Sequence, residues 1–335
     1  MSNQLKGVSN QLIKELNLNK NDLTKMLYDM ILIRKFEENL KQLYQQGKIH
    51  GTMHLCIGQE ATAVGACFPL TKEDKITSTH RGHGHSIAKG TDVNKMVAEL
   101  LGKVTGYCKG KGGSMHIADM EVGNLGANGI VAAGLPLGTG AALTSQMKKL
   151  GYVVLCFFGD GATNEGAFHE SLNLASVWNL PIVFFCENNL YGMSGSIKEM
   201  TNIESIAIRG TSYGIPSETI DGNDILEVIK ATTAAVERAR SNNGPTLIEA
   251  NTYRWEGHSR SDARKYRTRE EEKEWKKSND PIERFKTVLF ENGIITEDEF
   301  VELNDKAIKQ IQDAVVFAEN SESPSLDSLM TDIYV

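Results

Sequence analysis

The chain has 335 residues, with 36 Lys and Arg against 43 Asp and Glu, a formal net charge of −7 and 40% hydrophobic residues. This length suffices for one large α/β domain or two smaller ones, and the composition is typical of a globular protein rather than a disordered one. The acidic balance gives no electrostatic case for nucleic-acid binding, which requires a basic surface.

Neither a membrane-spanning segment nor a secretory signal is expected. The longest dense apolar runs, at residues 153–158 and 182–186, are too short to cross a bilayer, and the amino terminus lacks a continuous apolar stretch. The cysteines are scattered and form no Cys-x-x-Cys pair, so we expect reduced thiols and a cytoplasmic location. These cysteines are Cys56, Cys67, Cys108, Cys156 and Cys186.

The first part of the chain predicts a loose arm followed by helices. Residues 1–20 are polar and show no strong period, so we expect a loose amino-terminal arm. From Asp22 onward, apolar residues recur at helical spacing as far as Tyr44, with Asp22 placed to cap the helix and Gly47 to end it. A second helix is expected to begin near Gly58.

The segment from residue 102 to residue 140 contains 11 glycines in 39 residues. One interpretation is a flexible surface loop. We favour a structured binding loop, because the glycines alternate with His116, Asn124, Asn128 and apolar residues, and because glycine lets a backbone approach a ligand closely.

The middle of the chain predicts a βαβ unit. An apolar strand at 153–158 is followed by a Gly-Asp-Gly turn, a helix at 165–177 and a second apolar strand at 182–186. Such a unit implies parallel strands and a right-handed crossover. A helix after Asp224, a strand at 246–250 and an amphipathic helix at 297–318 follow. We therefore predict an α/β fold with a doubly wound, mainly parallel sheet, helices on both faces, and helical amino- and carboxy-terminal extensions.

Asp160 and Asn189 follow the two strands of this βαβ unit, and ligands of open parallel sheets bind beyond the carboxyl ends of the strands. A carboxylate and an amide oxygen at the amino terminus of a helix are hard ligands of the kind that Mg²⁺ and its phosphate partners require. Taken singly, each motif is more simply a turn. Their occurrence on two strands of one unit favours a ligand site.

Several motifs around these residues resemble those of a known family. They are His54-Leu55 with Gly58-Gln59-Glu60-Ala61, Thr79-His80-Arg81-Gly82-His83-Gly84-His85, Lys109-Gly110-Lys111-Gly112-Gly113-Ser114-Met115-His116, Gly159-Asp160-Gly161 and Glu187-Asn188-Asn189-Leu190-Tyr191-Gly192. The chain resembles the α subunits of the thiamine-diphosphate-dependent first components of 2-oxo acid and acetoin dehydrogenase complexes. The resemblance covers roughly residues 22–290 and implies the thiamine-diphosphate-binding fold, with thiamine diphosphate and Mg²⁺ as cofactors.

The resemblance also implies roles for individual residues. Asp160, Asn189 and the carbonyl of Tyr191 correspond to Mg²⁺ ligands, and Arg81 and Arg254 to contacts of the diphosphate. Gly129 and Val131 correspond to backbone positions that hold the aminopyrimidine ring. His54, His83 and His258 correspond to catalytic polar residues around the reacting carbon, with His258 also near the cofactor. Further cofactor contacts are expected from Gly159, Gly161 and Ala162.

The resemblance divides the chain into an arm at 1–20, a cofactor-binding domain at 21–290 that carries the diphosphate and Mg²⁺ half of the site, and a helical extension at 291–335. In this family a glutamate from a separate β subunit activates the cofactor, and no segment here corresponds to it. We therefore expect an α₂β₂ assembly that passes its acyl group to a lipoyl-bearing acyltransferase, and an inactive isolated chain. Ser259 corresponds to a regulatory phosphorylation site of mitochondrial relatives, and nothing in the sequence indicates a kinase.

For the substrate, the motifs at 80–85 and 114–119 are most similar to acetoin-type subunits, since His80 replaces a tyrosine of mitochondrial pyruvate-type relatives. Pyruvate is the alternative, and a branched-chain 2-oxo acid is less favoured.

Two other classes of protein are alternatives. A self-sufficient thiamine enzyme needs a longer chain, and a non-catalytic Mg²⁺–nucleotide binding module needs no site histidines. By spacing, His80, His83 and His85 suggest a metal site, but no cysteine or carboxylate neighbour completes one.

Overall fold

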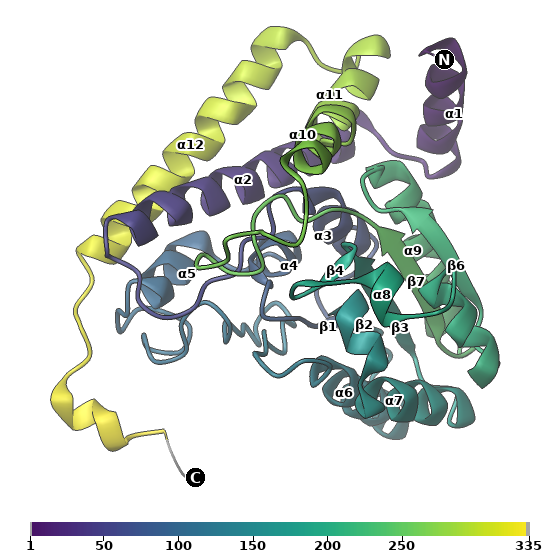
Figure 1. Cartoon of the computed structure of the whole chain (residues 1–335), viewed down its shortest axis with the longest axis horizontal. Helices are drawn as coiled ribbons and strands as arrows, with labels where there is room; N and C mark the ends of the chain where they lie inside the picture. Colours follow the sequence, from purple (N-terminus) through teal and green to yellow (C-terminus); the bar gives the residue numbers. More distant parts are fainter. Residues whose placement is uncertain (1, 333–335) are drawn as a thin grey trace.

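The computed structural model describes residues 2–332, and the side chains from residue 9. Its centre is a five-stranded parallel sheet with the strand order β1-β2-β3-β7-β6 (Figure 1). A separate antiparallel hairpin pairs two short strands, β4 and β5. The strands are β1 (Lys75–Thr77), β2 (Val154–Gly159), β3 (Ile182–Asn188), β4 (Tyr191–Gly192), β5 (Gly195–Ser196), β6 (Ser217–Asp221) and β7 (Thr246–Asn251).

Helices surround this sheet and extend beyond it. The α-helices are α1 (Ser2–Glu15), α2 (Lys20–Gln45), α3 (Glu60–Cys67), α4 (His83–Lys89), α5 (Val93–Leu100), α6 (Gly134–Lys148), α7 (Gly166–Val177), α8 (Ile197–Met200), α9 (Ile225–Arg240), α10 (Arg269–Ser278), α11 (Pro281–Glu291) and α12 (Glu297–Glu319). Three 3₁₀ helices complete the secondary structure: η1 (Asp160–Asn164), η2 (Ile206–Tyr213) and η3 (Leu326–Met330). None of the described helices is long and apolar enough to cross a membrane.

The central strands are apolar throughout because both faces of the sheet are covered. Along β2, Val154, Cys156 and Phe158 pack with Phe168 and other residues of α6 and α7. The alternate residue Phe157 packs on the opposite face, in a cluster that includes residues of α3 and α9. Side chains of successive strand residues point to opposite faces, so one continuous apolar run supplies two cores. The prediction of a doubly wound α/β fold with a parallel sheet is confirmed.

A third apolar cluster joins the helices at the two ends of the chain. The long helix α2 lies beside α12 in Figure 1, and residues of both belong to one buried cluster. The structure differs from the loose arm expected at 1–20, since α1 occupies Ser2–Glu15 and Leu12 is buried in that cluster. Apolar contacts at Leu12, Ile13 and Leu16 hold this helix, although the segment is mostly polar. The domain boundaries at residues 21 and 290 stay predictions.

The other predicted elements lie where the sequence placed them, with ends shifted by a few residues. The glycine-rich segment is the least regular part: α6 begins at Gly134, and residues 101–133 contain neither a helix nor a strand of the sheet. Their path is nevertheless fixed by hydrogen bonds. The Glu99 carboxylate accepts from the main-chain N–H groups of Cys108, Gly110, Gly112 and Gly113. A buried carboxylate therefore orders the loop that the sequence predicted to be structured.

Candidate active site

The carboxyl ends of β2 and β3 bring Asp160 and Asn189 to the same edge of the sheet. The register pairs Gly159 with Glu187, so Asp160 and Asn189 leave adjacent strands within two residues of each other. Both side chains are buried. Burial raises the pKa of Asp160 to about 6, partly offset by hydrogen bonds to main-chain N–H groups and by the charge of Arg254. The predicted pairing of these two residues is thus present.

The amide of Asn189 is oriented by its neighbour. Its Nδ2 donates to Oε1 of Gln59 over 3.0 Å. Its buried Oδ1 has no hydrogen-bond partner in the described part of the chain. A buried acceptor without a partner is unfavourable unless a ligand completes it. Together with the Asp160 carboxylate, this oxygen fits a hard divalent cation.

The hairpin β4–β5 closes over this edge. The carbonyl of Tyr191 accepts a hydrogen bond from Nη1 of Arg254 over 3.3 Å. The backbone at Gly192 lies so near Gly161 that a Cβ added to either glycine would meet the Cα atom of the other at 3.2 Å. A Cβ at either position would force the two backbones slightly apart, so glycine favours this close approach of the hairpin to the turn after β2. Tyr191, Asp160 and Asn189 line the same cavity.

Two buried guanidinium groups lie beside these oxygens. Arg81 and Arg254 are 4% and 1% exposed, and neither forms an ion pair among residues 9–332. Arg81 donates to the carbonyl of Leu55 at 2.5 Å and to that of His258 at 3.1 Å. Burial and the neighbouring Arg254 lower the pKa of Arg81 to about 9. Buried cations without a carboxylate are costly, so this pair fits a polyanionic ligand such as a diphosphate.

A close contact between two loops positions both arginines. Gly58 has φ +96°, and a Cβ there would meet the Trp255 side chain at 2.4 Å and the Tyr253 carbonyl at 2.7 Å. Glycine at this position lets the segment from His54 to Gly58 lie against the segment that carries Arg254. The main-chain N–H of Trp255 donates to the carbonyl of Ile57 over 3.2 Å, which fixes the contact.

The residues at the strand ends and the two arginines surround one cavity of about 360 Å³, which is within the usual size of a cofactor or small-molecule pocket. Asp160, Asn189, Arg81 and Arg254 line one part of it. Val131 also lines it and is 51% exposed, whereas Gly129 is exposed but does not line it. The other predicted cofactor contacts in the lining are Gly159, Gly161, Ala162, Tyr191 and His258.

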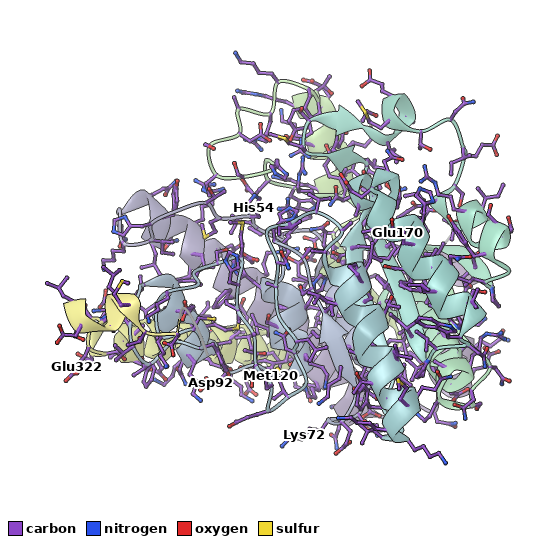
Figure 2. All side chains as sticks on the ribbon, turned by 90° about the horizontal axis from the view of Figure 1, so that it is seen from below. His54, Lys72, Asp92, Met120, Glu170 and Glu322 are labelled. Atoms are coloured by element: carbon purple, nitrogen blue, oxygen red, sulfur yellow. The ribbon has the colours of Figure 1, made fainter. Side chains whose placement is uncertain are left out.

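Three histidines gather beside this cavity: His80 and His258 line it, and His54 packs against both without lining it. The ring centroid of His54 lies 4.5 Å from that of His80 and 4.9 Å from that of His258. Burial first, and the charge of Arg81 second, lower the pKa values to about 3 for His54, about 2 for His80 and about 4 for His258. All three rings are therefore neutral at pH 7. In Figure 2, His54 lies near the middle of the view, above Asp92, which precedes α5, and to the left of Glu170 of α7.

His83, expected beside these histidines, lies elsewhere. It is fully buried and does not line the cavity. Its Nδ1 lies 3.1 Å from the Glu37 carboxylate and its Nε2 lies 2.9 Å from the hydroxyl of Ser114, so both ring nitrogens have partners. His54 and His258 therefore lie together in the structure, whereas His83 is packed between α2 and the glycine-rich loop.

The loop that carries His258 is held by the charged residues after it. The buried Arg267 donates to the carbonyls of Arg254, Trp255 and Glu256 and forms an ion pair with Glu272 at 2.8 Å. The carboxylate of Asp262 accepts from the main-chain N–H of His258 at 2.6 Å and from the Tyr266 hydroxyl at 2.6 Å. The charged residues between Arg254 and Glu272 thus bind one another and the main chain of this loop.

The family follows from a comparison with known proteins. A model of the family described as Dehydrogenase E1 component matches residues 28–327. The chain belongs to this family. Its members are thiamine-diphosphate-dependent dehydrogenase components, so this E1-family chain is part of an enzyme, and the resemblance drawn from the motifs is confirmed.

Individual relatives are similar over nearly the whole chain. The α subunit of acetoin:2,6-dichlorophenolindophenol oxidoreductase from Bacillus subtilis is 49% identical over 92% of both chains. The subunit of the same name from Cupriavidus necator is 42% identical over 96% of both chains. The pyruvate dehydrogenase E1 component α subunit of Rhizobium meliloti is 41% identical over 94% of this chain and 90% of its own.

Sequence reasoning did not single out His80 as a site residue. The sequence suggested it only for a metal site with His83 and His85 and as a residue that distinguishes acetoin-type from pyruvate-type subunits. In the structure His80 turns toward His54 and His258, whereas the ring of His85 stacks on Phe157 at 3.8 Å and lies 3.3 Å from the Glu187 carboxylate. The spacing of these residues gave no signal of this separation, which arises because His80 precedes α4 and the other two histidines lie within it.

Proposed function

We propose that the chain is the α subunit of the first component of an acetoin dehydrogenase complex, which cleaves acetoin and passes the two-carbon acyl unit to a lipoyl-bearing acyltransferase. The observation that carries this proposal is the pair of buried guanidinium groups, Arg81 and Arg254, without carboxylate partners beside the buried oxygens of Asp160 and Asn189. This arrangement suits a diphosphate bound together with a cation. The acetoin-linked names of the two relatives described above support the choice of substrate.

In this proposal the ends of β2 and β3 hold Mg²⁺. The Asp160 carboxylate, the Asn189 Oδ1 and the Tyr191 carbonyl would supply oxygen ligands to this ion, which would also bind the diphosphate of thiamine diphosphate. Arg81 and Arg254 bind the remaining diphosphate oxygens. The main chain around Gly129 and Val131 holds the aminopyrimidine ring, and Gly159, Gly161 and Ala162 allow close approach of the cofactor.

Bound thiamine diphosphate supplies a nucleophilic carbon for addition to a carbonyl group and an electron sink for carbon–carbon cleavage. The residues of this chain orient the substrate and move protons. His258 and His80 line the cavity and are placed to exchange hydrogen bonds with the substrate's carbonyl and hydroxyl oxygens. His54 packs against both rings and limits their rotation. For His83 we propose an indirect role, since its Nε2 is paired with Ser114 in the glycine-rich loop.

We further propose that a β subunit covers the exposed end of the cavity and completes an α₂β₂ assembly. Ile130 and Val131 line the cavity and are 72% and 51% exposed, which supports a partner at this position. Exposed apolar side chains continue over α6 and α7, and such surfaces mark protein interfaces. These side chains are Leu137, Met147, Leu174, Val177 and Trp178. The five free cysteines support a reducing compartment, the cytoplasm.

Oxidative decarboxylation of pyruvate is the second candidate. The relatives named as pyruvate dehydrogenase α subunits, such as that of Rhizobium meliloti at 41% identity, support it. Neither a branched-chain 2-oxo acid nor a simple Mg²⁺–nucleotide module has comparable support from the relatives described above.

Steady-state rates of the chain co-purified with its β subunit test the proposal, with acetoin, pyruvate and a branched 2-oxo acid compared side by side and an artificial electron acceptor. We expect the highest kcat/KM with acetoin, and no turnover by the isolated chain. A preference for pyruvate would establish the second candidate instead. Calorimetry with thiamine diphosphate, ATP and NAD⁺ in Mg²⁺ tests the cofactor, and tight binding of ATP without thiamine diphosphate would overturn the proposal.

A further inference from the structure

Glu37 of α2 is fully buried without a basic partner. No Lys or Arg of residues 9–332 forms an ion pair with it. Its Oε1 accepts from the main-chain N–H of Cys56 over 3.1 Å and from the Cys56 thiol over 3.0 Å, and it lies 3.1 Å from Nδ1 of His83. Burying a carboxylate is costly unless hydrogen bonds compensate it, so these three groups hold Glu37 in one position.

One peptide group connects Glu37 to Arg81. The carbonyl of Leu55 and the N–H of Cys56 belong to the same planar unit. Glu37 accepts from the N–H, and Nη1 of Arg81 donates to the carbonyl over 2.5 Å. A carboxylate and a guanidinium group are therefore joined through opposite sides of one peptide group. Each polarises this group in the direction that strengthens the other hydrogen bond.

The same carboxylate reaches the glycine-rich loop through His83. An ionised carboxylate only accepts hydrogen bonds, so it places the proton of the His83 ring on Nδ1. Nε2 then accepts from the hydroxyl of Ser114 over 2.9 Å. Glu37 thus holds the segment that contains Leu55 and Cys56 and, through His83, the loop that contains Ser114.

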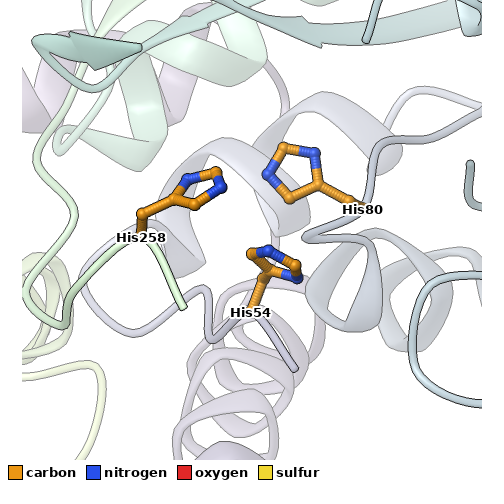
Figure 3. A group of neighbouring side chains, drawn as sticks. All are labelled: His54, His80 and His258. Carbon is orange, nitrogen blue, oxygen red and sulfur yellow. The ribbon is translucent and has the colours of Figure 1, made fainter. Parts of the chain in front are cut away.

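The Arg81 guanidinium has a second anchor and N–H groups to spare. Its Nη2 donates to the carbonyl of His258 over 3.1 Å, and its remaining N–H groups can bind an anion in the cavity that Arg81 lines. Figure 3 shows the rings of His54 and His80 together, with centroids 4.5 Å apart. These histidines directly precede Leu55 and Arg81, so the peptide bridge joins the two segments that carry them.

We propose that Glu37 is a positioning residue, which acts through the Leu55–Cys56 peptide group to hold the Arg81 guanidinium in the orientation that binds the cofactor's diphosphate. This inference rests on the proposed function, because it takes a diphosphate as the ligand of Arg81. Glu37 does not line the cavity, so its effect on the ligand passes through other residues. An arginine side chain that is already oriented loses less freedom when the ligand binds, so loss of Glu37 should weaken binding.

A double-mutant cycle tests this role. Calorimetry in Mg²⁺, on the chain co-purified with its β subunit, measures the Kd for thiamine diphosphate in wild type and Glu37→Leu, and again with Arg81→Lys or Arg254→Lys added. We expect Glu37→Leu to raise the Kd about tenfold alone and with Arg254→Lys, but less than about threefold with Arg81→Lys. Arg254 is the matched control, because its guanidinium lines the same cavity but donates to the carbonyls of Tyr191 and Met193.

A conservative variant separates positioning from packing. Glu37→Gln keeps an oxygen for the N–H of Cys56, so its Kd should stay within about threefold of the wild type. If Glu37→Leu does not fold, as judged by circular dichroism, Glu37→Asp withdraws the oxygen on a shorter side chain and gives the same comparison. A loss in Glu37→Gln as large as that in Glu37→Leu would overturn the inference.

The outcomes of the cycle are distinct from those of the activity assay. Equal factors in all three backgrounds, or an unchanged Kd in Glu37→Leu, would overturn the inference, because Glu37 would then not act through Arg81. Coupling to Arg81 in an assembly that cleaves no acetoin supports the inference and rejects the function, and equal factors in an assembly that cleaves acetoin do the opposite. A wild type that binds no thiamine diphosphate would overturn both.

Discussion

The Asp160 carboxylate faces the main-chain amide of Asn189 across the ends of β2 and β3. This relationship follows from parallel pairing, because the register that pairs Gly159 with Glu187 carries both residues to one edge. Asp160 has no ion-pair partner within the described residues, although it is 2% exposed. A cation at this point would satisfy both the carboxylate and the unpaired Oδ1 of Asn189.

Asp160→Ala should abolish Mg²⁺-dependent binding of thiamine diphosphate while the fold is kept. The change removes the only charged group that the protein contributes to the proposed ligand set, so we expect affinity to fall at least ~100-fold, or about 2.7 kcal/mol. Calorimetry in Mg²⁺ measures the loss, and circular dichroism reports the fold. The control Asp298→Ala removes an exposed carboxylate in the first turn of α12 and should leave affinity unchanged. Unchanged affinity in Asp160→Ala would contradict the ligand role.

Arg81→Lys should weaken cofactor binding although the positive charge is retained. The guanidinium holds the carbonyls of Leu55 and His258 and has further N–H groups for phosphate oxygens, which a single ammonium cannot match. We expect the Kd for thiamine diphosphate to rise about 10- to 100-fold. Arg269→Lys, at the exposed start of α10, is the matched control. If free thiamine, which lacks the diphosphate, lost as much affinity, the contact with phosphate would be refuted.

The sheet, and the edge of it at which a ligand was expected, could be predicted from the sequence because both depend on local patterns. The apolar runs of β2 and β3, separated by one helix, require parallel strands, and parallel strands place Asp160 and Asn189 together. The paired arginines could be assigned only through the family resemblance, since Arg81 and Arg254 lie far apart in the chain. Arg81 donates to the carbonyl of Leu55, and the N–H of Trp255, next to Arg254, donates to that of Ile57. Both arginines therefore meet the same segment through tertiary contacts that no local pattern reveals.

For the same reason, the sequence could not predict which histidine side chains face the cavity. Spacing in the run from His80 to His85 says nothing of which rings face the cavity, because the start of α4 at His83 turns the chain between them. His83 lies in the interior, where it contacts Glu37 of α2, a residue that no sequence pattern singled out. The helix at Ser2–Glu15 was likewise not predicted, since its stability depends on tertiary packing of a few apolar residues rather than on a strong period.

Arg267→Ala should release the loop that carries His258. Arg267 is buried and holds three consecutive carbonyls of that loop, so its removal leaves those carbonyls without their donor and the Glu272 carboxylate with Arg264 alone. We expect faster proteolytic cleavage between residues 256 and 268 and a loss of turnover in the assembled enzyme. Limited proteolysis followed by mass spectrometry locates the cuts.

Arg264→Ala is the matched control for this prediction. It removes the other guanidinium bound to Glu272, at 3.0 Å, from a more exposed position and without loop carbonyls as partners. Equal cleavage rates in the two variants would mean that the ion pair with Glu272, and not the contacts with the carbonyls, orders the loop.

Asp74→Asn should destabilise the edge of the sheet where β1 begins. The buried Asp74 accepts from the main-chain N–H groups of Val153 at 2.8 Å and Thr71 at 2.7 Å and pairs with Arg240 at 2.7 Å. It thereby joins β1, the start of β2 and the end of α9. Loss of the charge should lower the free energy of unfolding by about 2–3 kcal/mol, as judged from urea midpoints at pH 7.

The pH dependence of this difference gives a second test. Burial opposes ionisation of Asp74, but the hydrogen bonds from Arg240, Val153 and Thr71 outweigh it and hold the pKa below its ordinary value of 3.8. A carboxyl whose pKa is lower in the folded state stabilises the fold above its unfolded pKa and loses that effect as the pH falls through the folded value. Wild type and Asp74→Asn should therefore differ equally at pH 7 and pH 5 and converge only below pH 3.8. A difference that already shrinks between pH 7 and pH 5 would show that the Asp74 carboxylate is not held in its charged form by these partners.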